Sequence, residues 1–281
     1  MGMARLRFLH IPKSAGTTFS NCLRRIYGAH RLKNNIFIFY GDLQKDIQRY
    51  RKLSDSERSQ IILFSGHAPL ITGEAEIDEL PTITFLRDPV ERVKSFCQAV
   101  SEEKVQGMAW KDFDLDRLLL GDAAWLRNHQ TRMLLGVGGY ELPGQDQNSL
   151  VEKAVDVIKN RLAGFGITER FEDSIILLSK ELGWDACPIY TKLNQKNRSR
   201  ELGFTDVQLS RIREINMLDI KVYEAALLVF EERINSHEAY FDSERNKMRF
   251  RQNIFGRFLI GYRIYHQLQA AWIKLRNKVS V

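Results

Sequence analysis

The stretch FLHIPKSAGTTF, residues 8–19, decides the expected fold, because it joins a strand, a loop of small residues and a helix. The apolar residues before Pro12 are typical of a short buried strand. After Gly16, apolar residues recur at helical spacing as far as Tyr27, and Gly28 ends the helix. A loop of small residues before a helix N-terminus presents backbone N–H groups to an anion. The stretch therefore predicts a phosphate-binding loop at the edge of an α/β sheet.

The rest of the chain also alternates between strand and helix patterns. Buried strands are predicted at 5–11, 60–67 and 82–87. Helices are predicted at 89–100, 114–120, 122–135, 148–161, 171–182, 205–215 and 217–235. This alternation indicates an α/β fold: a P-loop-like domain with a mostly parallel central sheet flanked by helices and a helix-rich second half. We expect one domain over 1–240 and a basic amphipathic helical tail over 241–281, with the Gly-rich segment 136–148 as the candidate lid.

The charge of the chain is concentrated at its C-terminal end. The net charge is +7, yet residues 245–281 hold nine Lys and Arg and no Asp or Glu. Of the 42 basic residues, 33 remain in residues 1–244, beside all 35 acidic ones. A uniformly basic nucleic-acid binder does not have this distribution. We therefore expect no nucleic-acid partner.

Cysteine content and hydropathy indicate the compartment. Cys22, Cys97 and Cys187 are scattered and form no CxxC pair, which argues against a disulfide framework or a zinc site. We see no signal-peptide pattern at the N-terminus and no apolar span of ~20 residues. The expected location is the cytoplasm.

The loop differs from a Walker phosphate loop. In the Walker pattern a Lys follows the last Gly, and the next Ser or Thr binds magnesium. Here Thr17 follows Gly16, and Lys13 precedes the small residues. Taken from the residues alone, the alternatives are a phosphate loop of another kind and a turn that binds no ligand.

A second stretch, TFLRDPVERVKSF at 84–96, predicts another strand-to-helix junction. Asp88 can cap the helix and complete a capping box with Glu91. Neither Arg87 nor Ser95 is needed for that helix start. An Arg at the carboxyl edge of a parallel sheet is well placed for a bidentate phosphate contact.

Together these two stretches resemble the PAPS-dependent sulfotransferases, particularly the carbohydrate branch that includes heparan sulfate 2-O-sulfotransferase. The donor of these enzymes, PAPS, is 3′-phosphoadenosine 5′-phosphosulfate, and PAP is the product. The resemblance covers residues 5–235 and continues through the stretches SGHAPL (65–70), NHQTRMLLG (128–136), GFGITERFEDSIILLSKELG (164–183) and LNQKNRS…LDIKVYEAA (193–226). It implies a P-loop-like α/β fold and sulfuryl transfer to a carbohydrate hydroxyl.

The resemblance also implies a donor site that needs no metal. The 5′-phosphosulfate would lie on Pro12, Lys13, Ser14, Ala15, Gly16, Thr17 and Thr18. The 3′-phosphate would lie at Arg87 and Ser95, and a basic loop with Asn194, Lys196 and Arg198 would close over the nucleotide. Lys13 would stand near the bridging oxygen, where negative charge grows in the transition state.

His67 is the expected general base. It follows a predicted strand, and an ordinary imidazole pKa of ~6.5 suits proton transfer near neutrality. By the resemblance, it matches the catalytic His of the 2-O-sulfotransferases. Those enzymes carry H-x-H, whereas this chain has Ser65 at the first position. The alternative is a turn histidine, with His129 as the reserve base.

The segment NHQTR is expected to line the acceptor pocket through His129, Gln130 and Arg132. Arg132 can pair with an acidic sugar or form an internal ion pair, and the residues alone leave both open.

The tail has three possible partners besides the protein body. Read as a helix, it carries an aromatic stripe that includes Tyr265 and Trp272, with basic residues mainly on the other face. A helix of this kind at 245–281 would be able to lie on an anionic membrane surface, bind an acidic polymer or pair with its copy in a homodimer. The plainer interpretation is that its apolar stripe packs on the body.

The overall expectation is a PAPS-dependent sulfotransferase with a carbohydrate or glycolipid acceptor. A P-loop small-molecule kinase is the first alternative, although it requires a magnesium-binding Ser or Thr after Gly-Lys. A non-catalytic membrane- or polyanion-binding module is the second.

Overall fold

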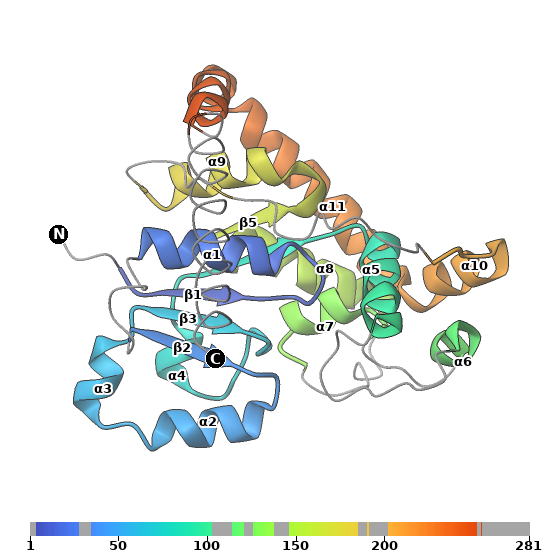
Figure 1. Cartoon of the computed structure of the whole chain (residues 1–281), viewed down its shortest axis with the longest axis horizontal. Helices are drawn as coiled ribbons and strands as arrows, with labels where there is room; N and C mark the ends of the chain where they lie inside the picture. The colour runs from blue at the N-terminus through green and yellow to red at the C-terminus, as the bar shows by residue number, and fades with distance from the viewer. Residues whose placement is uncertain are drawn as a thin grey trace, which may run out of the picture.

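The computed structural model has one parallel sheet at its centre (Figure 1). The structure describes residues 4–27, 35–102, 114–120, 126–137, 146–184, 190, 202–251 and 254. Within them the strand order is β2-β3-β1-β4-β5, and every pairing is parallel. The strands are β1 (Leu6–Leu9), β2 (Ile36–Phe39), β3 (Leu63–Gly66), β4 (Thr82–Leu86) and β5 (Gly164–Ile167). The predicted α/β fold is confirmed.

Helices flank this sheet. They are α1 (Gly16–Ile26), α2 (Leu43–Arg51), α3 (Asp55–Gln60), α4 (Ala75–Asp78), α5 (Pro89–Ser101), α6 (Leu115–Leu120), α7 (His129–Leu134), α8 (Gln147–Asp156), α9 (Phe171–Glu181), α10 (Asp206–Ile215) and α11 (Met217–Asn235). A π-helical turn, η1 (Val157–Arg161), extends α8, and a 3₁₀ turn, η2 (Thr168–Arg170), precedes α9. In Figure 1, α2 and α3 lie beyond β2 and α9 lies beyond β5, so helices cover both ends of the strand order.

The structure differs from the sequence expectations in several places, and two of these differences have a clear physical cause. Strand β2 and helices α2, α3 and α4 were not predicted. Strand β5 was also missed, because glycines weaken a strand pattern. Its Gly166 is required by packing, since a Cβ there would lie 2.6 Å from the Phe85 ring. Of the helix predicted over 122–135, residues 126–128 are not helical and α7 begins at His129, because Asn128 has a left-handed backbone (φ 42°); residues 122–125 lie outside the described residues.

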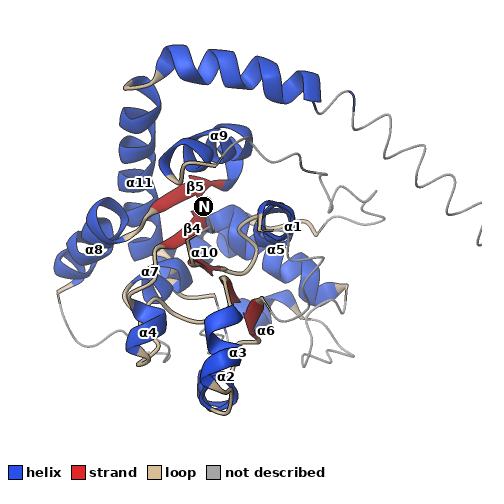
Figure 2. Cartoon of the chain, turned by 90° about the vertical axis from the view of Figure 1, so that its left-hand side faces the viewer, coloured by secondary structure: helices blue, strands red, loops and turns tan. Residues whose placement is uncertain are grey.

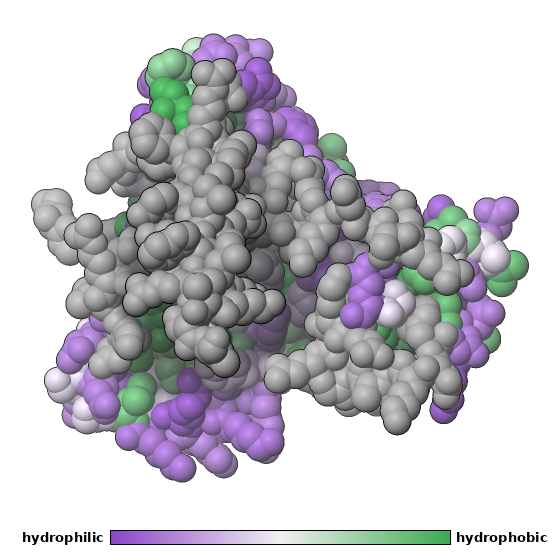
Figure 3. All heavy atoms as spheres, in the orientation of Figure 1, coloured by the Kyte–Doolittle hydropathy of each residue, from purple (hydrophilic) through white to green (hydrophobic). Residues whose placement is uncertain are grey.

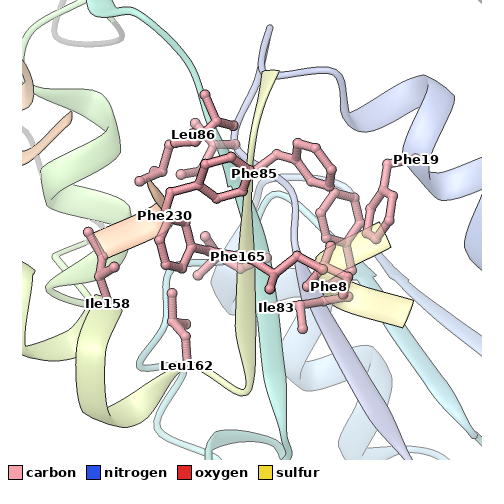
Figure 4. Close-up of a cluster of buried hydrophobic side chains, with 14 of the residues drawn as sticks. Phe8, Phe19, Ile83, Phe85, Leu86, Ile158, Leu162, Phe165 and Phe230 are labelled. Atoms are coloured by element: carbon pink, nitrogen blue, oxygen red, sulfur yellow. The ribbon is translucent and has the colours of Figure 1, made fainter. Parts of the chain in front are cut away.

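The core is formed by aromatic side chains from neighbouring strands and the helices over them (Figure 4). Phe8, Phe85 and Phe165 come from β1, β4 and β5, and each is at most 1% exposed. Phe19 of α1 and Phe230 of α11 pack at either side of them. Burying one such side chain fully contributes ~1.5–3 kcal/mol. The core therefore fixes β1 and β4, whose ends carry the candidate site.

The sheet has a topological switch point between β1 and β4. The chain passes from β1 to β2 in one direction along the sheet and from β4 to β5 in the other. Because such crossovers are right-handed, the connecting helices leave on opposite faces. Open α/β sheets bind ligands in the crevice at the carboxyl ends of strands at such a point.

The first part of the expected tail packs on the body. Residues 238–251 form a helix that crosses the end of α11 (Figure 2), so the expected domain boundary at 240 falls inside a helix. Its Phe241 is fully buried and Met248 is 3% exposed in the main core. Arg245 Nε lies 2.7 Å from Asp173 Oδ1. Residues 255–281, with most of the aromatic stripe, lie outside the described residues. Membrane attachment through 245–281 stays a prediction, and no described helix is long and apolar enough to cross a membrane.

A chain that ends at Glu244 is therefore expected to melt at a lower temperature than the full chain. The deletion removes Met248 from the core, and losing a buried Met side chain costs ~2–5 kcal/mol. The measurement is thermal unfolding by circular dichroism. Phe250→Ala is the matched control, because Phe250 is 68% exposed on the same helix, and this variant should melt close to the full chain. Equal melting of the chain that ends at Glu244 would contradict a structural role for Met248 and Arg245.

Candidate functional site

Segments that follow three adjacent strands meet at the carboxyl edge of the sheet. Residues 10–15 follow β1, His67 follows β3 and Arg87 follows β4. The His10 N–H donates to the Gly66 carbonyl at 3.0 Å, which joins the first segment to the end of β3. Arg87 Nη1 donates to the Lys13 carbonyl at 3.0 Å, which joins the first segment to the third. The structure thus brings together the loop, the expected base and the expected phosphate-binding Arg.

The loop before α1 has the backbone of an anion site. Lys13 and Ala15 have left-handed backbones, with φ values of 69° and 56°. Such conformations cost non-glycine residues of order 1–3 kcal/mol each and cluster at ligand-binding positions. Left-handed residues just before a helix N-terminus are a recurring feature of backbone anion sites, although the Ser14 N–H here donates to the Ile11 carbonyl at 3.3 Å. Ser14 lies between Lys13 and Ala15, 1% exposed, and its buried hydroxyl has no hydrogen-bond partner among the described residues.

An unpartnered buried hydroxyl costs ~1–3 kcal/mol, so a ligand that accepts its proton would recover that free energy. The other loop residues flank Ser14 in the sequence. Pro12, Lys13 and Thr18 are half-buried, whereas Thr17 is exposed. Two left-handed residues, a buried unpartnered hydroxyl and a helix N-terminus thus meet in this loop, and such a combination suits an anion with several oxygens.

His10 is a member of the site that sequence reasoning missed. Its ring stacks on Phe8 with ring centroids 5.5 Å apart, and it lies 4.4 Å from the His67 ring. It also lies directly over Gly16, where an added Cβ would come within 1.8 Å of the imidazole. Gly16 is therefore needed because the His10 ring occupies the space of a side chain. Burial, and then the nearby His67 and Lys13, lower the pKa of His10 to about 3, so this ring stays neutral near pH 7.

His67 is oriented as a general base requires. Its Nδ1 lies 2.9 Å from the His10 carbonyl oxygen, which can only accept a proton. Nδ1 therefore carries the hydrogen, and Nε2 keeps a lone pair. Burial lowers the pKa of His67, while the bond to the His10 carbonyl opposes that shift. Ser65, which stands where the 2-O-sulfotransferases carry the first His of H-x-H, pairs with Phe8, and the imidazole next to His67 belongs to His10, just after the neighbouring strand β1.

Arg87 lies in a network of polar groups at the start of α5. Its guanidinium has Glu169 at 3.7 Å and Glu91 at 3.9 Å, in addition to the Lys13 carbonyl. Asp88 caps α5 as predicted, accepting from the Glu91 N–H at 2.8 Å. The predicted capping box is wrong, because the Asp88 N–H donates to Glu169 Oε1 at 3.2 Å and Glu91 pairs with Lys94. Glu169 was missed because it comes from the η2 turn after an unpredicted strand.

Gln130 supports the Arg87 backbone. It is 1% exposed, its Oε1 accepts from the Arg87 N–H at 2.9 Å, and its Nε2 donates to the Arg87 carbonyl at 2.8 Å. Asp219 of α11 in turn accepts from the Gln130 and Thr131 N–H groups and so caps α7. These contacts favour a positioning role for Gln130 over the expected contact with substrate.

His129 and Arg132 face each other on α7. Arg132 Nη2 lies 3.3 Å from His129 Nδ1, and its Nε donates to the Arg127 carbonyl at 3.0 Å. Arg132 is only 5% exposed. Burial, and then Arg92 and Arg132, hold the pKa of His129 well below its ordinary value. His129 Nε2 is buried with no partner within the described part of the chain.

The remaining expected site residues are less defined. Ser95 is half-buried on α5, two turns after Arg87. Asn194, Lys196 and Arg198 lie outside the described residues, as does most of the candidate lid at 136–148. In the described ranges, no cluster of His, Cys, Asp and Glu is suited to hold a metal ion.

Comparison with known proteins gives no match: neither a protein-family model nor a curated protein matches this chain.

Proposed function

We propose that this protein is a PAPS-dependent sulfotransferase that acts on a hydroxyl of a carbohydrate acceptor, in a polysaccharide or a glycolipid. The observation that carries the proposal is the meeting of an anion cradle with an oriented base. The loop around Ser14 and the His67 imidazole are joined through His10, whose ring packs on Gly16 and whose carbonyl holds His67 Nδ1. Group transfer from a bound anionic donor needs these two parts side by side.

The proposed reaction is an in-line displacement at sulfur. The acceptor oxygen forms a bond to sulfur while the bond from sulfur to the bridging phosphate oxygen breaks. His67 Nε2 takes the acceptor proton, and the electron pair of the broken bond stays on the phosphate of PAP. Lys13, at the start of the cradle, would stabilise the charge that grows on this oxygen.

Arg87 and Ser95 would hold the 3′-phosphate of the donor. Arg87 Nη1 donates a hydrogen bond to the Lys13 carbonyl, and this bond connects the two ends of the proposed nucleotide site. Its carboxylate neighbours stand 3.7 and 3.9 Å away, beyond direct hydrogen-bond distance. A phosphate oxygen bonded directly to the guanidinium would be the stronger partner.

Adenosine 3′,5′-bisphosphate is expected to raise the melting temperature in the absence of magnesium. Binding to the native state adds RT ln(1 + [L]/Kd), or ~2.7 kcal/mol at a hundredfold excess over Kd. ATP lacks the 3′-phosphate and should give a much smaller shift. The measurement is differential scanning fluorimetry with EDTA present.

Arg87→Ala is the matched variant and should reduce the shift from adenosine 3′,5′-bisphosphate more than the small shift from ATP. Equal shifts from the two nucleotides, or a strict need for magnesium, would overturn the sulfotransferase proposal in favour of the kinase.

A further inference from the structure

The residues that follow β2, β3 and β1 are neighbours at the carboxyl edge of the sheet. Phe39 and Leu9 each pair with Gly66 in the sheet register. The next residue of each strand is Tyr40, His67 and His10 respectively. The His67 N–H donates to the Phe39 carbonyl at 3.1 Å, and the His10 N–H donates to the Gly66 carbonyl at 3.0 Å, so the pairing extends to these residues. Tyr40 therefore stands on the opposite side of His67 from the donor loop.

The turn that carries Tyr40 is rigidly built. Asp46 is 3% exposed, and its Oδ2 accepts from the Tyr40 N–H at 2.7 Å and the Gly41 N–H at 3.3 Å. Arg49 bonds to the other oxygen of Asp46 at 2.8 Å. The Arg49 guanidinium also lies 4.9 Å from the Tyr40 ring centroid and 4.3 Å from that of Phe37. The backbone and one side of the Tyr40 ring are thus held in place.

Tyr40 is nevertheless 72% exposed. The described surface over the neighbouring α2 and α3, at the lower left of Figure 3, is largely hydrophilic. A fixed tyrosine offers a large, rigid and amphipathic contact area at a small entropy cost. A sugar ring matches it, because a pyranose has an apolar C–H face and a rim of hydroxyls.

The position favours the acceptor over the donor as the occupant. The anion cradle follows β1 and Arg87 follows β4, whereas Tyr40 follows β2, which lies beyond the β3 that carries His67 at its end. In an in-line displacement the acceptor oxygen approaches sulfur from the side away from the leaving phosphate. The base must then contact the acceptor on the side that faces away from the nucleotide.

We propose that Tyr40 is the contact surface for a sugar ring of the acceptor, next to the hydroxyl that His67 deprotonates. This inference rests on the proposed function. It assigns a substrate-binding role to a residue that no motif indicated.

Tyr40→Ala tests the assignment. With labelled PAPS and two probe acceptors, a neutral tetrasaccharide and a glucuronate-containing tetrasaccharide, the acceptor KM should rise about tenfold, the change that 1.4 kcal/mol of lost contact free energy gives. Tyr40→Trp should retain most of the affinity. Phe250→Ala is the matched control, since Phe250 is 68% exposed on a distant helix and its loss should leave KM unchanged. The melting shift from adenosine 3′,5′-bisphosphate should be the same in all four proteins.

Saturation-transfer NMR with the same tetrasaccharides separates the two proposals. If the wild type binds a saccharide and Tyr40→Ala does not, the contact is supported even when no sulfuryl transfer is detected. An unchanged KM and unchanged saccharide signals in Tyr40→Ala would overturn the inference and leave the sulfotransferase proposal intact. A loss of the nucleotide shift in Tyr40→Ala would instead place the ring in the donor site. A wild type that neither binds nor sulfates either saccharide would overturn the inference as well.

Discussion

Replacing His67 with alanine is expected to lower turnover by roughly 10²–10⁴-fold, the usual contribution of a positioned general base. The His10 carbonyl fixes the proton on Nδ1 at 2.9 Å, so only Nε2 can take the acceptor proton. Alanine removes that lone pair and leaves the backbone of the donor loop unchanged. The measurement is the single-turnover rate of sulfuryl transfer from labelled PAPS. Nucleotide affinity should survive, because the cradle belongs to the loop after β1.

The pH dependence provides a second measure of the same group. Burial lowers the pKa of His67 below its ordinary value. The neutral imidazole is the active form, so the rate should stay level above the folded-state pKa and fall only as pH drops through it. The midpoint of this acid limb is therefore expected below ~6.5, the ordinary value for His. His67→Ala should lack that limb.

His237→Ala is the control for His67→Ala, since His237 is an exposed histidine just after α11. Its turnover should equal that of the wild type. Near-normal turnover of His67→Ala would show that the base is another residue. His129, whose Nε2 is buried and unpartnered within the described residues, would be tested next.

The fold could be predicted where apolar runs are long and uninterrupted. The run before Pro12 and the run at 82–87 gave β1 and β4, and the Asp88-Pro89 junction gave the start of α5. Strand β5 was not predicted, because its sequence GFGI contains two glycines, which weaken a strand pattern. Packing requires both glycines, since a Cβ at either position would collide with neighbouring side chains. Local pattern therefore located the central strands, and tertiary packing determined an edge strand.

The candidate site also contains residues that local pattern could locate and residues that only the tertiary fold brings in. That Lys13, His67 and Arg87 come together at one edge of the sheet could be predicted, because each follows a strand and belongs to a recognisable motif, and their roles stay predictions. Residues that act across the sheet could not. His10 acts through its contacts with Gly16 and His67, and Glu169 acts on the Arg87 side chain from beyond β5. Sheet register and crossover connections create such contacts, and neither is readable from spacing along one segment.

Replacing Lys13 with alanine should lower turnover by roughly 10²–10³-fold, the scale for removing one preorganised group that stabilises a developing oxyanion. Lys13 also has a left-handed backbone (φ 69°), and its carbonyl accepts from Arg87 at 3.0 Å. Alanine and lysine bear the same strain there, and both keep the carbonyl. Stability and nucleotide binding should therefore change far less than the rate, which a single-turnover assay beside a thermal melt would measure.

Lys13→Gly separates charge from backbone strain. Glycine adopts a left-handed backbone without the ~1–2 kcal/mol penalty of other residues, so this variant should melt at or above the temperature of Lys13→Ala. If the ammonium is the catalytic element, Lys13→Gly and Lys13→Ala will be equally slow, and Lys13→Arg will recover part of the rate by restoring a positive charge. A Lys13→Ala protein that turns over within a few-fold of the wild type would exclude charge stabilisation by this side chain. A Lys13→Gly protein that is much faster than Lys13→Ala would show instead that loop conformation limits the reaction. A Lys13→Gly rate equal to that of Lys13→Ala indicates an electrostatic role for Lys13, and a much higher rate indicates a conformational one, so this comparison distinguishes the two.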